Sequence, residues 1–149
     1  MQVSELFEGR HSELFTIGPD GTVAELIEAL NLKHVGALVV VDPDGRWLGL
    51  VSERAVLRIA YDSAKKAVDC TKRVRELMRT KGDLPAITMR TRLNEALGLM
   101  HSARTRHLVV VSDDDRPIAC VSVRDIAERL LESAQMENRE LQKFMYGFE

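Results

Sequence analysis

Four polar side chains in the second half of the chain have the chemistry needed to hold a phosphate and a ribose. Ser122 ends a predicted strand, and Asp125 lies in the first turn of the helix predicted to follow it. A hydroxyl and the free N–H groups of a helix start can bind phosphate oxygens, and a carboxylate can accept hydrogen bonds from a ribose diol. Arg106 and His107 stand just before the neighbouring predicted strand and add two donors suited to phosphate. If the two strands pair, these groups converge at one end of a sheet.

The elements that would position these residues occur twice. The run Leu-Val-Val-Val at 38–41 returns at 108–111, an offset of 70 residues, and Val-Ser-x-Arg at 51–54 returns at 121–124. Apolar positions stay in step along this alignment without a gap. Such register is the signature of internal duplication, so the chain contains two copies of one unit.

Each copy predicts the same order of elements: a short strand, a helix, two further strands and a second helix. Thr22 and Thr91 are expected to cap the first helix of each copy, because apolar residues then recur with the spacing of one buried face. Each β-branched run is typical of a strand covered on both faces, and turn residues separate it from a strand that ends at Ser52 or Ser122. A sheet this small with two helices leaves one face bare, so we expect the copies to cover each other.

The expected organisation is two units, a connector and a tail. The predicted bounds are 1–60 for the first unit, 61–72 for a helical connector that lacks Pro and Gly, 73–131 for the second unit, and 132–149 for a helical extension. Large apolar residues of the extension fall on one helical stripe, namely Leu141, Phe144, Met145 and Phe148. This stripe either packs on its own unit or forms a dimer contact.

The two copies differ at the polar positions. In the first copy Gly36 and Ala37 replace the basic pair and Ala55 replaces the acid, while Ser52 and Arg54 remain. Three polar groups are thus absent together from one copy and present together in the other. This pattern predicts one working polar site in the second copy and a weaker or vestigial one in the first. Taken singly, each residue also has a structural explanation as a helix cap, a dipole partner or a solvated cation.

Composition and motifs disfavour several other functions. With 21 Lys and Arg against 23 Asp and Glu, the net charge is -2, which makes nucleic acid an unexpected partner, and the basic stretch 72–81 is more simply a solvated helix face. No nucleophile motif includes a histidine base, and no metal-ligand spacing occurs, so neither an enzyme nor a metal site is expected.

Cys120 lies in an apolar run and is expected to be a small core residue. The longest apolar run, 35–41, is too short to span a bilayer, and no secretion signal is evident, which predicts a cytoplasmic protein without a membrane partner.

The repeated motifs resemble those of a tandem pair of CBS (cystathionine-β-synthase) domains, a Bateman module of the bacterial stand-alone type. The resemblance covers residue 3 to about residue 131, and it rests on His-Val-Gly-Ala-Leu-Val-Val-Val-Asp at 34–42, Gly-Leu-Val-Ser-Glu-Arg at 49–54, and their counterparts at 106–111 and 121–126. The family pattern is glycine, two apolar residues, Thr or Ser, any two residues, and then Asp or Asn. Ala119 replaces the glycine in the second copy, and Ala55 replaces the acid in the first.

The resemblance implies a mixed α/β fold of two βαββα units related by pseudo-two-fold symmetry, with the sheets packed face to face and two clefts between them. It also implies a non-catalytic regulatory homodimer that binds AMP, ADP or ATP, acts on an effector protein of unknown identity, and needs no cofactor. S-adenosylmethionine or NAD is an alternative ligand, and a dimerisation module with empty clefts is an alternative function. The ligand-binding positions fall on Arg106, His107, Ser122, Arg124, Asp125, Ala86 and Ile87, with Ser52 and Arg54 in a weaker second site.

Overall fold

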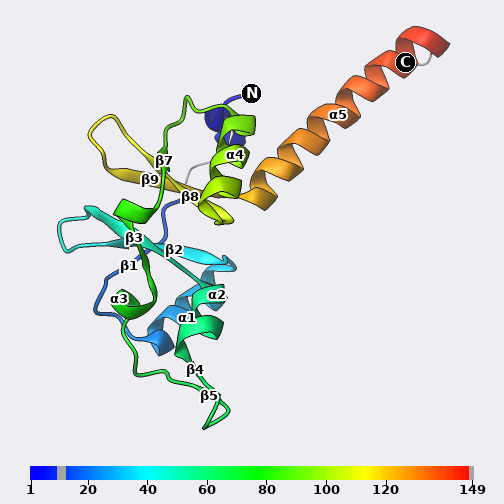
Figure 1. The fold of residues 1–149 in the computed structure, drawn as a ribbon. Coiled ribbons are helices and arrows are strands. Elements are labelled where there is room, and N and C mark those ends of the chain that lie inside the picture. Colours follow the sequence, from blue (N-terminus) through cyan, green and yellow to red (C-terminus); the bar gives the residue numbers. More distant parts are fainter. Residues whose placement is uncertain (10–12, 148–149) are drawn as a thin grey trace.

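Two units with one order of elements make up the computed structural model, which describes residues 1–9 and 13–147 (Figure 1). The first unit contains β1 (Thr16–Ile17), α1 (Val23–Lys33), β2 (Ala37–Val41), β3 (Trp47–Ser52) and α2 (Glu53–Ala55). The second contains β7 (Ala86–Ile87), α4 (Leu93–Ala103), β8 (His107–Val111), β9 (Pro117–Ser122) and α5 (Val123–Tyr146). The predicted fold of two βαββα units is confirmed.

The first helices of the two units begin in different ways. Thr22 caps α1 as predicted, since its hydroxyl accepts a hydrogen bond from the backbone N–H of Glu25 at 3.2 Å. The residue before α4 is Arg92, and the hydroxyl of Thr91 instead accepts from the N–H of Thr88 at 3.0 Å. The prediction that Thr91 caps α4 is therefore wrong, because its side chain closes the preceding turn.

The two sheets pack against each other through a shared core. In each unit the first strand pairs in parallel with the second, which pairs antiparallel with the third. A fourth strand, β6 (Arg79–Thr80), extends the first sheet beside β3. The shared core contains buried residues of both units, namely Ala37, Val39, Trp47, Leu50, Leu84, Val109 and Val111. The predicted face-to-face packing thus follows from strands that are apolar on both faces.

The leading segment of each copy packs on the other copy. The short helix η1 (Val3–Phe7) joins the second unit, where Val3 is fully buried and its N–H donates to the carbonyl of Thr91 at 2.8 Å. The corresponding helix α3 (Val74–Leu77) joins the core of the first unit through Val74. This exchange links the two copies. It also places residues of both copies beside α2 in the first unit and beside the start of α5 in the second.

Gly49 allows β6 to approach the first sheet closely. A Cβ atom at this position would lie 2.2 Å from the backbone oxygen of Arg79. In the part of the chain that the structure describes, the second sheet has three strands, and buried Ala119 occupies the equivalent place. Ala119 can therefore replace the glycine of the family pattern, because no fourth strand is described beside β9.

The connector between the units is a hairpin, so the predicted helix over 61–72 is wrong. Two short strands, β4 (Tyr61–Asp62) and β5 (Ala67–Val68), pair antiparallel. The Asp62 carboxylate accepts the backbone N–H groups two and three residues later at 3.0 and 3.3 Å, and Lys66 takes a positive φ of 51°. A local turn held by an aspartate side chain competes with the helix here.

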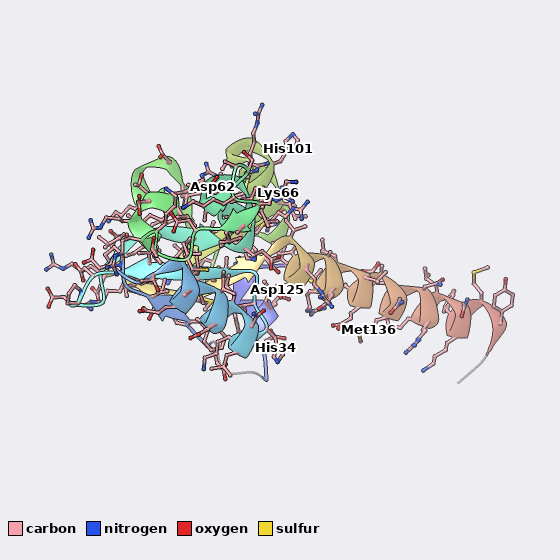
Figure 2. All side chains as sticks on the ribbon, turned by 90° about the horizontal axis from the view of Figure 1, so that it is seen from below. His34, Asp62, Lys66, His101, Asp125 and Met136 are labelled. Carbon is pink, nitrogen blue, oxygen red and sulfur yellow. The ribbon has the colours of Figure 1, made fainter. Side chains whose placement is uncertain are left out.

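The last helix extends well beyond the two units. α5 runs without interruption through 24 residues, and its C-terminal part projects away from the body of the molecule (Figure 1). Figure 2 shows Asp125 at the body end of this helix and Met136 on the projecting part. Leu141, Phe144 and Met145 are exposed to 59%, 89% and 67%. The tail therefore does not pack on its own unit, and Phe148 lies outside the described residues.

Candidate functional site

A cavity of about 650 Å³ lies between α2 of the first unit and the turn before β8 of the second. This volume is typical of ligand sites in proteins. Ser52 and Arg54 line the cavity from the first unit, and Arg106 and His107 line it from the second. The cavity thus combines the Ser–Arg pair of one copy with the basic pair of the other.

Cations dominate the lining of this cavity, which we call the arginine cavity. One carboxylate, that of Glu53, lines it together with His107 and five arginines: Arg54, Arg58, Arg79, Arg104 and Arg106. Arg79 donates to the backbone oxygens of Ala103 at 2.8 Å and Asp83 at 3.3 Å. The other four guanidinium groups make no hydrogen bond or ion pair with any residue that the structure describes. Their donors are available to an anion with charged oxygens.

The remaining part of the lining is mostly apolar. It includes side chains from α1, β3 and the segment after α2, among them Ile27, Leu30, Leu50, Leu57 and Ile59. That segment is a π-helix, η2 (Val56–Ala60), whereas α5 continues as an α-helix at the equivalent place. π-helical turns are often found at functional sites. The arginine cavity therefore offers both an apolar wall for a flat base and cations for an anionic group.

His107 lies where the two units meet. A Cβ atom built on Gly36 would lie 3.5 Å from the His107 ring and 3.5 Å from the Glu53 carboxylate. Burial lowers the pKa of His107; the carboxylates of Asp125 and Glu53 oppose this shift, and Arg106 adds to it. The imidazole is therefore neutral at pH 7 in the ligand-free protein, and it can gain a proton when an anion binds.

Ser122 and Asp125 form a reciprocal cap at the start of α5. The N–H of Ser122 donates to the Asp125 carboxylate at 2.8 Å, and the N–H of Asp125 donates to the Ser122 hydroxyl at 3.1 Å. His107 and Ser122 are register partners, so the four polar residues do lie at one end of the sheet. Asp125, however, lines a second cavity of about 270 Å³ beside η1, and the basic pair lines the arginine cavity.

A sequence model of the CBS domain matches this chain twice, over residues 3–62 and 74–132. The chain belongs to the CBS-domain family. The fold of this CBS pair is similar to that of a putative signal-transduction protein with CBS domains from Burkholderia ambifaria, with a TM-score of 0.77, 25% identity, and coverage of 89% of this chain and 95% of that one. It is also similar in fold to CBSX2 of Arabidopsis thaliana, solved in complex with AMP, with a TM-score of 0.71, 22% identity, and coverage of 89% and 98%.

Part of a larger enzyme also matches this CBS pair. The chain is 32% identical over 117 residues to inosine-5'-monophosphate dehydrogenase of Methanocaldococcus jannaschii. The match covers 78% of this chain and 22% of that enzyme. The similarity therefore concerns a limited part of the dehydrogenase.

The second cavity of the CBS pair reverses the charge of the first. Glu128 occupies the place that corresponds to Arg58, and Glu8 occupies the place that corresponds to Arg79. Carboxylates from η1, its flank and α5 line this cavity together with Arg129, namely those of Glu5, Glu8, Asp125, Glu128 and Glu132. The two CBS domains therefore form clefts of opposite charge.

Four of the predicted ligand-binding residues lie outside both cavities: Ser122, Arg124, Ala86 and Ile87. Arg124 is in the first turn of α5, where its guanidinium donates to the Glu128 carboxylate at 3.0 Å. Ile87 belongs to the core of the second CBS domain, and its neighbour Ala86 is exposed on β7. Their suggested roles toward a ligand stay predictions.

Sequence reasoning did not identify three arginines of the arginine cavity. Arg58 stands one helical turn after Arg54, a spacing that could have drawn attention to it. Arg104 follows α4 in the left-handed conformation, and no pattern in the sequence predicted this conformation or its place in the cavity. Arg79 comes from the exchanged segment after α3, and its place depends on that exchange.

The basic stretch 72–81 is engaged within the protein. Arg75 pairs with Asp20, Lys72 lies 3.9 Å from Glu76, and Lys81 lies 3.1 Å from Asp115. These partners leave little free positive charge for a nucleic acid.

The described residues contain no group of three or more His, Cys, Asp or Glu side chains that could hold a metal ion. None of the described helices is both long enough and apolar enough to cross a bilayer.

Burial raises the pKa of the Cys120 thiol to about 12. That thiol is therefore protonated and unsuited to nucleophilic attack near neutral pH.

Proposed function

We propose that this CBS pair is a non-catalytic regulatory module that binds a phosphate-bearing adenosine ligand, AMP, ADP or ATP, in the arginine cavity. The observation that carries the proposal is the meeting of four unpartnered guanidinium groups, from both CBS domains, beside an apolar wall. A ligand bound there touches both domains. It can therefore shift a dimer or effector equilibrium by binding one arrangement more tightly than another.

The lining residues suggest a role for each part of the ligand. Arg54, Arg104 and Arg106 would hold the phosphate with His107, and the apolar wall would face the base. Ala55 provides no ribose acceptor, but Glu53 is the carboxylate that lines this cavity. The complex of CBSX2 with AMP shows that a protein of this fold takes such a ligand.

This proposal makes the arginine cavity, with Ser52 and Arg54, the main site, and it makes the site of Ser122 and Asp125 the weaker one. The sequence had predicted the opposite order of the two sites. NAD also carries phosphates and remains an alternative ligand. S-adenosylmethionine carries a sulfonium charge that the arginines repel, so we assign it a lower affinity.

A thermal-shift panel with AMP, ADP, ATP, NAD, S-adenosylmethionine and GTP tests the proposal. A ligand at about 100 times its Kd stabilises the folded state by about 2.7 kcal/mol, which raises the Tm of a domain of this size by about 5–10 °C. We expect such a rise with an adenine nucleotide and a smaller one with GTP. The proposal fails if the Tm does not respond to any adenosine ligand.

A structural dimerisation module is the second candidate, and the exposed apolar residues of α5 favour it. Light scattering of the full chain and of Phe144→Glu would measure the oligomeric state. The structural function would be favoured over ligand sensing if the full chain forms a dimer that does not respond to nucleotides and if Phe144→Glu dissociates that dimer.

A further inference from the structure

The arginine cavity carries more positive charge than one phosphate can neutralise. We infer that it selects an adenosine ligand with a chain of at least two phosphates over a monophosphate, and that one such ligand binds per chain. The inference rests on the proposed function and adds the charge class of the ligand.

The charge balance of the lining supports this selection. Five guanidinium groups face one carboxylate, Glu53, and Arg79 is already held by two backbone oxygens. Four guanidinium groups remain without a protein partner. The four arginines are exposed, and a phosphate monoester, with a charge of about -2 at pH 7, would leave about two of them without an anionic partner. A triphosphate brings charge and oxygens for all four.

The four groups also come from both CBS domains. Arg54 and Arg58 occupy successive turns of α2 and η2 in the first CBS domain, and Arg104 and Arg106 alternate along the turn before β8. A guanidinium binds phosphate best through two parallel N–H donors. Cations from the two domains can share an extended chain of phosphates, whereas a single phosphate offers them three terminal oxygens.

The backbone at Arg104 makes one substitution informative. Arg104 adopts a φ of 52°, a conformation that glycine takes without steric cost. Glycine at this position should therefore remove the cation without straining the backbone.

The second cavity explains why one ligand is expected. Glu8 and Glu128 stand there in place of Arg79 and Arg58, and five carboxylates line it beside Arg129. Phosphate chains are repelled by this lining, which leaves the arginine cavity as the site for them.

Calorimetric titration of the full chain with AMP, ADP and ATP in EDTA tests the inference, because EDTA keeps ATP free of magnesium. Arg58→Glu introduces the charge that the other copy carries at Glu128, and Arg104→Gly removes a cation where glycine suits the backbone. Arg90→Gln is the control, since Arg90 is exposed and lines neither cavity. Circular dichroism and thermal melting establish that each variant is folded.

We expect one ATP per chain, bound at least about tenfold more tightly than AMP. Arg58→Glu and Arg104→Gly should each weaken ATP about tenfold or more and weaken AMP less, while Arg90→Gln changes neither by more than about twofold. If Arg58→Glu does not fold, Arg104→Gly decides. Equal affinity for AMP and ATP, or two ATP per chain, would overturn the inference and leave the proposed function standing. Absence of binding by all three nucleotides would overturn both.

Discussion

Arg104 and His34 end equivalent helices of the two CBS domains, and both adopt the left-handed conformation, with φ of 52° and 55°. Arg104 lines the arginine cavity, and His34 lines neither cavity. The two residues therefore share a backbone strain but not an environment. Substitutions at these two residues can therefore distinguish the energetic cost of the left-handed conformation from the contribution of the Arg104 side chain to ligand binding.

Glycine at each of these two positions should relieve the strain. Arg104→Gly and His34→Gly should leave the free energy of unfolding unchanged or raise it by up to about 1 kcal/mol, as measured by urea denaturation. Nucleotide affinity should fall in Arg104→Gly alone. Equal affinities in the two variants would show that the Arg104 side chain has no part in binding.

His107 should give folding and ligand binding opposite pH dependences. Because burial lowers its pKa below 6.5 in the folded chain, the unfolded chain binds the extra proton as the pH falls through 6.5. Stability should therefore decrease from about pH 7.5 to about pH 5.5, while the affinity for an anionic ligand rises, since the anion favours the imidazolium. Denaturation and calorimetry across this range measure both, and His107→Gln should flatten both slopes.

Gly49 and Gly98 should respond to alanine in opposite directions. A Cβ on Gly49 meets the backbone oxygen of Arg79 at 2.2 Å, so Gly49→Ala must displace β6 and should cost about 1–3 kcal/mol. Nothing lies within 4 Å of a Cβ on Gly98 in α4, so Gly98→Ala should stabilise by about 0.5–1 kcal/mol. Chemical denaturation compares them, and a stable Gly49→Ala would argue against the close approach of β6.

The two cysteines should differ in reactivity. Cys70 is exposed, whereas burial, with the nearby Asp125 carboxylate, raises the pKa of Cys120 to about 12. Ellman's reagent should modify one thiol per folded chain and two after unfolding. Two fast-reacting thiols in the native protein would contradict the shielding and raised pKa of the half-buried Cys120 thiol.

The duplicated pattern of the chain was sufficient to predict the order of elements. Runs such as Leu38–Val41 are apolar on both faces, and two small sheets with such strands can only be covered by each other. The hairpin after Ala60 was missed because its turn contains neither Gly nor Pro, and Lys66 supplies the positive φ. The place of Thr91 was missed because a local turn took its hydroxyl.

The site was harder to predict because each cleft draws on both copies. Sequence placed Arg106 and His107 beside Asp125, and pairing of β8 with β9 does bring them to one sheet end. It could not show that the basic pair lines the cavity of the other domain, next to Arg54, or that Arg79 arrives from an exchanged segment. Such relationships depend on how the units are docked.

The ATP affinity of Arg106→Ala, compared with that of Asp125→Ala, tests most directly which cavity binds the ligand. Arg106 lines the arginine cavity, and Asp125 caps α5 and lines the other one. We predict that Arg106→Ala loses about 1.5–3 kcal/mol of binding free energy, whereas Asp125→Ala loses about 0.5–2 kcal/mol of folding stability and keeps its affinity. Loss of affinity in Asp125→Ala with normal affinity in Arg106→Ala would place the ligand in the other cleft and overturn the assignment of the site to the arginine cavity.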